Sequence, residues 1–186
     1  MTVQIIRPGR EHLAGYVAAL ERGWSADNVR GLLATREELA AIAEDADGFL
    51  SRLDDPQAKG GPLKAPDGTL MERLPGYRRW IWDGDFAGSV GFRWSKDGGP
   101  LPAHVLGHIG YAVPPWMAGR GYASFALGEV LKDARARGLA FVELTTDPDN
   151  AASQRVIEKN GGRMVERFVK PAVYGGGESL RWRIEL

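Results

Sequence analysis

The chain has 186 residues, and its 24 basic side chains (Lys and Arg) balance its 24 acidic ones (Asp and Glu). This length suits one domain with a sizeable core, while the balanced charge gives no indication of a nucleic acid or an acidic membrane as partner. The sequence contains no cysteine, which excludes disulfides, thiol catalysis and thiolate metal ligands.

The first third of the chain predicts one strand and two helices. Residues 3–7 are a short β-prone run, and residues 11–22 carry apolar side chains at helical spacing. Residues 36–53 predict a longer helix, for which Thr35 serves as N-cap and Glu38 completes a capping box.

Residues 54–76 predict a long surface loop. The segment holds four prolines and four glycines and has little periodicity. Long loops in compact domains are often binding loops or lids. Two interpretations therefore stay open, a lid over a substrate and an insertion without a chemical role.

The middle of the chain predicts an antiparallel meander. Residues 77–82 and 86–94 are aromatic and β-branched runs joined by Asp83-Gly84-Asp85, a favoured composition for a tight hairpin turn. Residues 104–113 predict a third strand, which Pro114-Pro115 ends.

A strand–helix–strand unit follows from this third strand. A helix with apolar residues at i, i+3 and i+4 begins just after Gly119 and Gly121, and Gly138 ends it. Residues 139–145 predict the next strand, which a right-handed crossover makes parallel to the third. The glycine turn then lies at the end of a central strand, where ligands usually bind in such sheets.

The remaining residues predict a short helix that begins at Asp149 or Asn150, and two closing strands at residues 163–169 and 179–185. The expected fold class is α/β, more specifically an α+β arrangement. A central mixed, mostly antiparallel sheet carries helices on both faces.

The glycine turn predicts a site for a phosphate-bearing cofactor. Glycine lets backbone N–H groups approach a ligand, and the helix behind them presents the positive end of its dipole. Two common phosphate motifs do not fit. A P-loop requires Gly-Lys-Ser/Thr where the chain has Gly121-Tyr122-Ala123, and a dinucleotide fingerprint requires glycine where Ser124 stands.

The run Val113-Pro-Pro-Trp-Met-Ala-Gly-Arg-Gly-Tyr-Ala123 resembles the acyl-CoA-binding motif of the GNAT (Gcn5-related) N-acetyltransferase superfamily, Gln/Arg-x-x-Gly-x-Gly/Ala. Gly121 and Ala123 match its last two fixed positions. Ala118 stands at the Gln/Arg position, a departure for which Arg120 supplies a nearby charge. The run from Asn150 through Ser153 to Gly161 is similar to a later motif of the family, and the order of elements also agrees. Within the family, the chain looks most like the bacterial "predicted acetyltransferase" branch.

The resemblance implies a single acetyltransferase domain over residues 1–186, with acetyl-CoA as co-substrate in a cleft beside residues 111–113. Backbone groups of residues 111–113 would pair with the pantetheine amides, the N–H groups of residues 119–123 would hold the pyrophosphate, and the last helix would contact the pantetheine arm. The residues implied in cofactor binding are Tyr111, Ala112, Val113, Ala118, Gly119, Arg120, Gly121, Tyr122, Ala123, Asn150 and Ser153.

The resemblance also implies candidates for proton transfer. His108 stands where many relatives carry a glutamate, and an imidazole accepts a proton near neutral pH. Ser153 is the candidate acid, because Ile157 occupies the position at which relatives often carry a tyrosine. The alternatives are a structural strand histidine and a serine that bonds locally. His104 is more readily structural or substrate-contacting, and no metal-ligand spacing is present.

The sequence therefore predicts a cytoplasmic N-acetyltransferase that transfers an acetyl group to the amine of a small molecule or a peptide. Three alternatives stay open: O-acyl or longer-acyl transfer, a non-catalytic acyl-CoA-binding module, and a nucleotide-binding protein. We expect no nucleic-acid or membrane partner and either a monomer or a homodimer. The sequence does not identify the acceptor.

Overall fold

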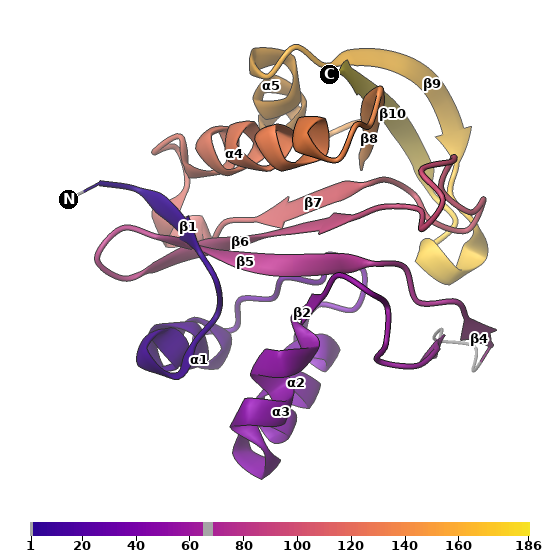
Figure 1. Ribbon diagram of the computed structural model, residues 1–186. Helices are drawn as coiled ribbons and strands as arrows, with labels where there is room; N and C mark the ends of the chain where they lie inside the picture. Colours follow the sequence, from indigo (N-terminus) through magenta and orange to yellow (C-terminus); the bar gives the residue numbers. More distant parts are fainter. Residues whose placement is uncertain (1, 65–68) are drawn as a thin grey trace.

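The computed structural model describes residues 2–64 and 69–186 (Figure 1). Two groups of strands form its centre. The first has the order β1-β5-β6-β7 with β2 paired to β5, and the second has the order β8-β10-β9. The strands are β1 (Gln4–Ile6), β2 (Asp54–Asp55), β5 (Gly76–Trp82), β6 (Phe86–Arg93), β7 (Ile109–Ala112), β8 (Phe141–Thr146), β9 (Arg163–Val169) and β10 (Glu178–Glu185).

Helices cover both faces of the first sheet. Figure 1 shows α1, α2 and α3 below it and α4 and α5 above it. The helices are α1 (Leu13–Glu21), α2 (Leu32–Glu44), α3 (Ala46–Arg52), α4 (Tyr122–Ala136) and α5 (Ala151–Lys159). The predicted fold class, α/β with a mostly antiparallel sheet flanked by helices, is confirmed. The predicted strands around residues 104–113 and 139–145 do not pair with each other as one sheet.

The meander β5–β6–β7 is antiparallel throughout, as predicted. Its third strand is shorter than expected, because β7 begins at Ile109 and residues 104–108 precede it outside any strand. This difference matters for His108. Strict alternation along a ten-residue strand cannot be used to place its side chain.

The predicted helix over residues 36–53 is two helices. Asp45 adopts an extended conformation between them, and its carboxylate accepts a hydrogen bond from the Gly48 N–H at 2.9 Å, which caps α3. The predicted capping box is wrong, because Thr35 lies inside α2 and its hydroxyl donates to the Trp24 carbonyl at 2.9 Å. Glu38 instead points to the sheet, where it bonds Tyr16 and Arg78.

Two apolar cores hold the layers together. One lies between α4 and the strands, around Leu127, Val130 and Val142, and the other lies between α1, α3 and the opposite face, around Tyr16 and Trp80. Most tryptophans are therefore explained by packing. The strands β5 and β6 contribute side chains to both cores by alternation.

The predicted loop over residues 54–76 contains short strands where it is described. These are β2, β3 (Leu63–Lys64) and β4 (Leu70–Met71), of which β3 and β4 pair with each other. Residues 65–68 of the prediction lie outside the described residues. The lid remains a prediction.

Candidate active site

The strands β7 and β8 separate near the middle of the fold. A backbone hydrogen bond links the residue just before β7 to β8, from the His108 N–H to the Glu143 carbonyl at 2.7 Å. Beyond it β7 pairs only with β6, and β8 only with β10, among the described strands. The second edge of β7 therefore faces an opening instead of a neighbouring strand.

A cavity of about 420 Å³ occupies this opening. Its lining includes Gly110 and Tyr111 of β7 and Leu144 and Thr145 of β8. A concave site between two such elements is a usual position for a ligand. The cavity brings together three of the predicted site residues, Tyr111, Asn150 and Ser153. Residues 118–123 do not line it, and Gly119, Arg120 and Gly121 lie exposed beyond it.

The glycine turn has the geometry that the sequence predicts for an anion site. Gly119 and Gly121 adopt positive φ angles of 79° and 82°, and no atom lies within 4 Å of where a Cβ would stand on either. No side chain caps α4, so its first N–H groups have no partner of that kind. Ala118 lies just before the turn in extended backbone and is exposed.

The start of α4 is anchored by a residue that we expected to act only through its backbone. The Tyr122 side chain is buried, and its hydroxyl donates to the Asp83 carboxylate at 2.7 Å. Asp83 belongs to the β5–β6 turn. This contact fixes the glycine turn to the sheet.

The last helix begins as predicted. The Asn150 side-chain oxygen accepts a hydrogen bond from the Ser153 N–H at 3.0 Å and caps α5. From β7, the Tyr111 hydroxyl donates to the Ser153 carbonyl at 3.1 Å. Burial raises the pKa of Tyr111 to about 12, so this hydroxyl keeps its proton at neutral pH. The second of these bonds joins α5 to β7.

The geometry of His108 does not support the expectation that it is the base. The side chain is buried, with 3% exposed, and Nδ1 accepts a hydrogen bond from the Glu143 N–H at 3.0 Å. A neutral imidazole that accepts at Nδ1 carries its proton on Nε2, so neither nitrogen has a free lone pair. Burial lowers the pKa of His108 to about 4, while Glu143 raises it and Arg93 lowers it further. The ring is a structural link between β7 and β8.

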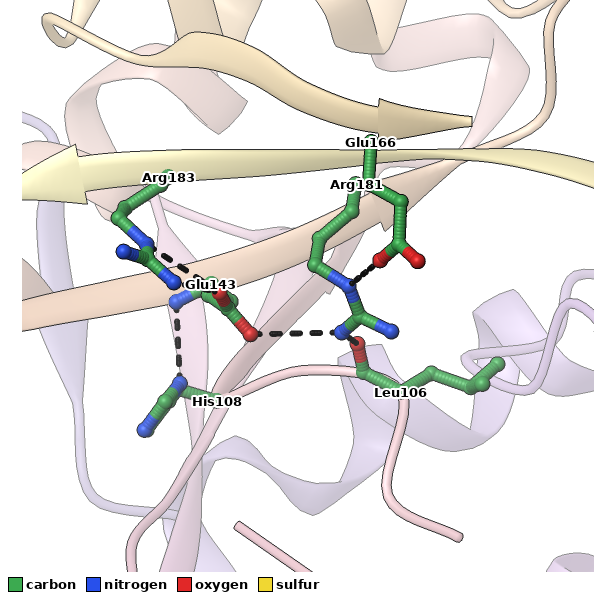
Figure 2. Close-up of polar contacts among 6 residues, drawn as sticks. All are labelled: Leu106, His108, Glu143, Glu166, Arg181 and Arg183. Carbon is green, nitrogen blue, oxygen red and sulfur yellow. Dashed lines mark hydrogen bonds and ion pairs between the residues drawn. The ribbon is translucent and has the colours of Figure 1, made fainter. Parts of the chain in front are cut away.

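The Glu143 side chain is held from the other side by β10. Figure 2 shows its carboxylate between Arg181, whose Nη1 lies at 3.3 Å, and Arg183, whose Nη2 lies at 2.8 Å. Arg181 also bonds the Glu166 carboxylate at 2.7 Å and the Leu106 carbonyl at 3.2 Å. This network fixes the segment that carries His108.

A second cavity of about 270 Å³ lies on the side of the sheet nearer to β2, β3 and β4. His104 lines it, consistent with a structural or substrate-contacting role and not with a place beside the β7–β8 opening. The two cavities share four lining residues, namely Arg78, Gly91, Arg93 and Tyr174.

Sequence reasoning missed the two arginines of this shared wall. They belong to β5 and β6, whose alternation alone does not reveal what lies opposite them.

Across residues 2–64 and 69–186, no group of three or more His, Cys, Asp or Glu side chains is arranged to hold a metal ion. In the same described ranges, no helix combines the length and apolar character that a membrane crossing needs.

Comparisons with known proteins agree with this geometry. A family model for the acetyltransferase (GNAT) domain matches residues 36–163. We found no match among curated proteins. Among solved structures, the chain is similar to a GNAT-family acetyltransferase from Bacillus anthracis, with 18% identity, a TM-score of 0.62 and coverage of 100% of this chain and 95% of that one.

Two further structures show the same likeness. A GNAT-family acetyltransferase from Streptococcus pneumoniae is 17% identical with a TM-score of 0.61, covering 100% of this chain and 99% of that one. The ribosomal alpha-N-protein acetyltransferase RimL, solved in complex with coenzyme A, is 14% identical with a TM-score of 0.62, covering 100% and 95%. At such identities the likeness shows a shared fold.

Proposed function

Because this chain belongs to the acetyltransferase (GNAT) family, we propose that it transfers an acetyl group from acetyl-CoA to a primary amine of a small molecule or a peptide. The reaction is direct attack of the amine on the thioester in a ternary complex. The observation that carries the proposal is the separation of β7 and β8 beside α4. No side chain caps this helix, and two glycines with positive φ angles, Gly119 and Gly121, precede it.

The cofactor fits the features of this opening. The open edge of β7 offers backbone groups of residues 111–113 to the pantetheine amides, as a neighbouring strand would. The N–H groups of residues 119–123 and the α4 dipole favour the pyrophosphate. Asn150 and Ser153 line the same cavity as Tyr111, which supports their assignment to the pantetheine arm.

The reacting amine must lose a proton before it attacks. An alkylamine with a pKa near ~10 is mostly protonated at neutral pH. Since His108 has no free lone pair, we assign this proton to water in the cavity. As the C–N bond forms, the backbone N–H of Val113 or its neighbour stabilises the oxyanion. The C–S bond then breaks, and the thiolate takes a proton from the Ser153 hydroxyl or from water.

Thiol release from acetyl-CoA with a panel of amines tests the proposal. Release that depends on one class of amine is the expected result. Binding of acetyl-CoA without turnover on any amine would instead indicate a non-catalytic acyl-CoA-binding module. Turnover with hydroxyl acceptors would indicate an O-acyltransferase, and turnover with longer acyl donors would indicate a longer-acyl transferase. Competition between ATP and coenzyme A in a thermal-shift assay would indicate a nucleotide-binding protein.

A further inference from the structure

A hollow in the sheet lies beside the β7–β8 opening, on the face that α1 and α2 cover. Its floor is made of two glycines that face each other across the sheet, Gly91 on β6 and Gly110 on β7. A Cβ on Gly91 would have no atom nearer than 3.7 Å, and a Cβ on Gly110 would meet only Arg93 Nη2, at 3.8 Å. The space that two side chains would fill is therefore open.

Two arginines stand at the edge of this hollow. Arg78 lies directly opposite Gly91 in the sheet register, and Arg93 lies two residues further along β6, so both point to the same face. Arg78 has a partner, because its Nη1 lies 2.8 Å from the Glu38 carboxylate. The guanidinium group of Arg93 has no hydrogen bond and no ion pair to any of the described residues, whereas its backbone N–H donates to the His108 carbonyl at 2.9 Å.

The surroundings of Arg93 leave its charge uncompensated. Arg93 is exposed to water as a residue, and its guanidinium group lies over the hollow, with Nη2 at 3.8 Å from the position of a Cβ on Gly110. Desolvation lowers the pKa of Arg93, the positive charge of Arg78 lowers it further, and only Tyr174 opposes this. A guanidinium group in such a position gains stability from any anion that enters.

The acidic side chains of the two cavities are already engaged. Asp55 lies 3.8 Å from Arg73, Glu72 lies 3.2 Å from Lys96, and Asp147 pairs with Lys170 at 2.6 Å. Asp27 accepts hydrogen bonds from the backbone N–H groups of residues 29 and 30. None of these carboxylates bonds Arg93.

We propose that the acceptor amine carries an anionic group, a carboxylate or a phosphate, and that Arg93 binds it. The inference rests on the proposed function and specifies its substrate class. Arg93 lines both cavities, so an anion bound there holds one end of the acceptor in the hollow while the amine enters the β7–β8 opening. Guanidinium groups match carboxylate and phosphate oxygens through two parallel hydrogen bonds.

Matched acceptors test the proposal and distinguish the two anions. The carboxylate arm compares 4-aminobutanoate with its amide, and the phosphate arm compares O-phosphoethanolamine with ethanolamine. For the wild-type protein we expect kcat/KM to be about 10–100-fold higher for the anionic member of at least one pair. Arg93→Gln should abolish this preference, measured as the ratio of kcat/KM between the two members of a pair, and Arg93→Lys should restore part of it. Arg135→Gln, an exposed arginine on α4, is the matched control.

A binding measurement separates this inference from the proposed function. With coenzyme A at saturation, inorganic phosphate and acetate are titrated calorimetrically into wild-type protein and Arg93→Gln. Anion binding that Arg93→Gln removes supports the site, even if no amine is turned over and the proposed function fails. Turnover with equal rates for charged and neutral acceptors, together with unchanged binding in Arg93→Gln, overturns the inference and leaves the acetyltransferase intact.

Discussion

The Nδ1 atom of His108 accepts a hydrogen bond from the backbone N–H of Glu143 at 3.0 Å, at the one point where β7 and β8 are still joined. The backbone N–H of His108 donates in turn to the backbone carbonyl of Glu143 at 2.7 Å. His108 and Glu143 are therefore joined by two hydrogen bonds, one from each backbone N–H. Past this pair the strands separate, so the pair sets where the opening begins.

We expect His108→Ala to destabilise the fold more than it impairs chemistry. The substitution leaves a cavity and a part-buried Glu143 N–H without an acceptor, each of which costs about 1–3 kcal/mol. His108→Asn can offer an oxygen near the position of Nδ1, so it should cost less. Denaturant unfolding of the three proteins measures the difference. A large loss of rate with unchanged stability would restore His108 as the base.

The pH dependence of stability should carry the signature of His108. Its pKa is about 4 in the folded protein against a usual value of 6.5, so the unfolded chain binds the proton more tightly. The stabilisation is complete above pH 6.5 and is lost as the pH falls toward 4, with a magnitude of roughly 3 kcal/mol. We expect the unfolding free energy of the wild type to fall over this range more steeply than that of His108→Asn. Equal slopes would contradict the lowered pKa.

The sequence predicted the fold class because hydrophobic period and turn chemistry are local. The Asp-Gly turn, the strands around it and the helix behind Gly121 all lie where the pattern indicates. The break at Asp45 was missed, since residues 36–53 keep a helical period across it. One residue in an extended conformation leaves almost no trace in such a pattern.

The candidate site was predictable where it depends on backbone geometry and not where it depends on distant neighbours. The cap made by Asn150 follows from three adjacent positions along the chain. The partner of His108 lies 35 positions away along the chain. The gap between β7 and β8 arises because the two strands belong to different sheets, which local sequence patterns do not specify. The unpaired state of Arg93 likewise depends on every element around it.

The glycine turn allows a comparison within one helix. Gly121 and Gly138 flank α4, have φ angles of 82° and 75°, and leave open space for a Cβ. Alanine at either position should therefore cost a similar ~1–2 kcal/mol of backbone strain. Only Gly121→Ala should also weaken acetyl-CoA binding, because it disturbs the N–H groups that the proposed function assigns to the pyrophosphate. Calorimetric titration of both variants measures this, and equal weakening would argue against the turn as the phosphate site.

Asn150 serves two purposes under the proposed function, and two substitutions separate them. Asn150→Ala removes the cap of α5 and should cost about 1 kcal/mol of stability together with cofactor affinity. Asn150→Ser keeps a capping oxygen but is shorter, so it should retain most of the stability and still lose affinity. Thermal unfolding and acetyl-CoA titration are the measurements. Full affinity in Asn150→Ser would leave Asn150 with capping alone.

The hydrogen bond between Tyr122 and Asp83 should couple the glycine turn to the β5–β6 hairpin. Tyr122→Phe and Asp83→Asn each weaken it, and a double-mutant cycle isolates the pair from the rest of each side chain. We expect a coupling energy of about 1–2 kcal/mol, because the bond is short, partly buried and accepted by a carboxylate. If the bond positions the turn, both single variants should also raise the KM for acetyl-CoA while kcat changes little. A measurable coupling with no change in KM would mean that Tyr122 stabilises the fold without positioning the cofactor, since α4 would then keep its place through its apolar face alone.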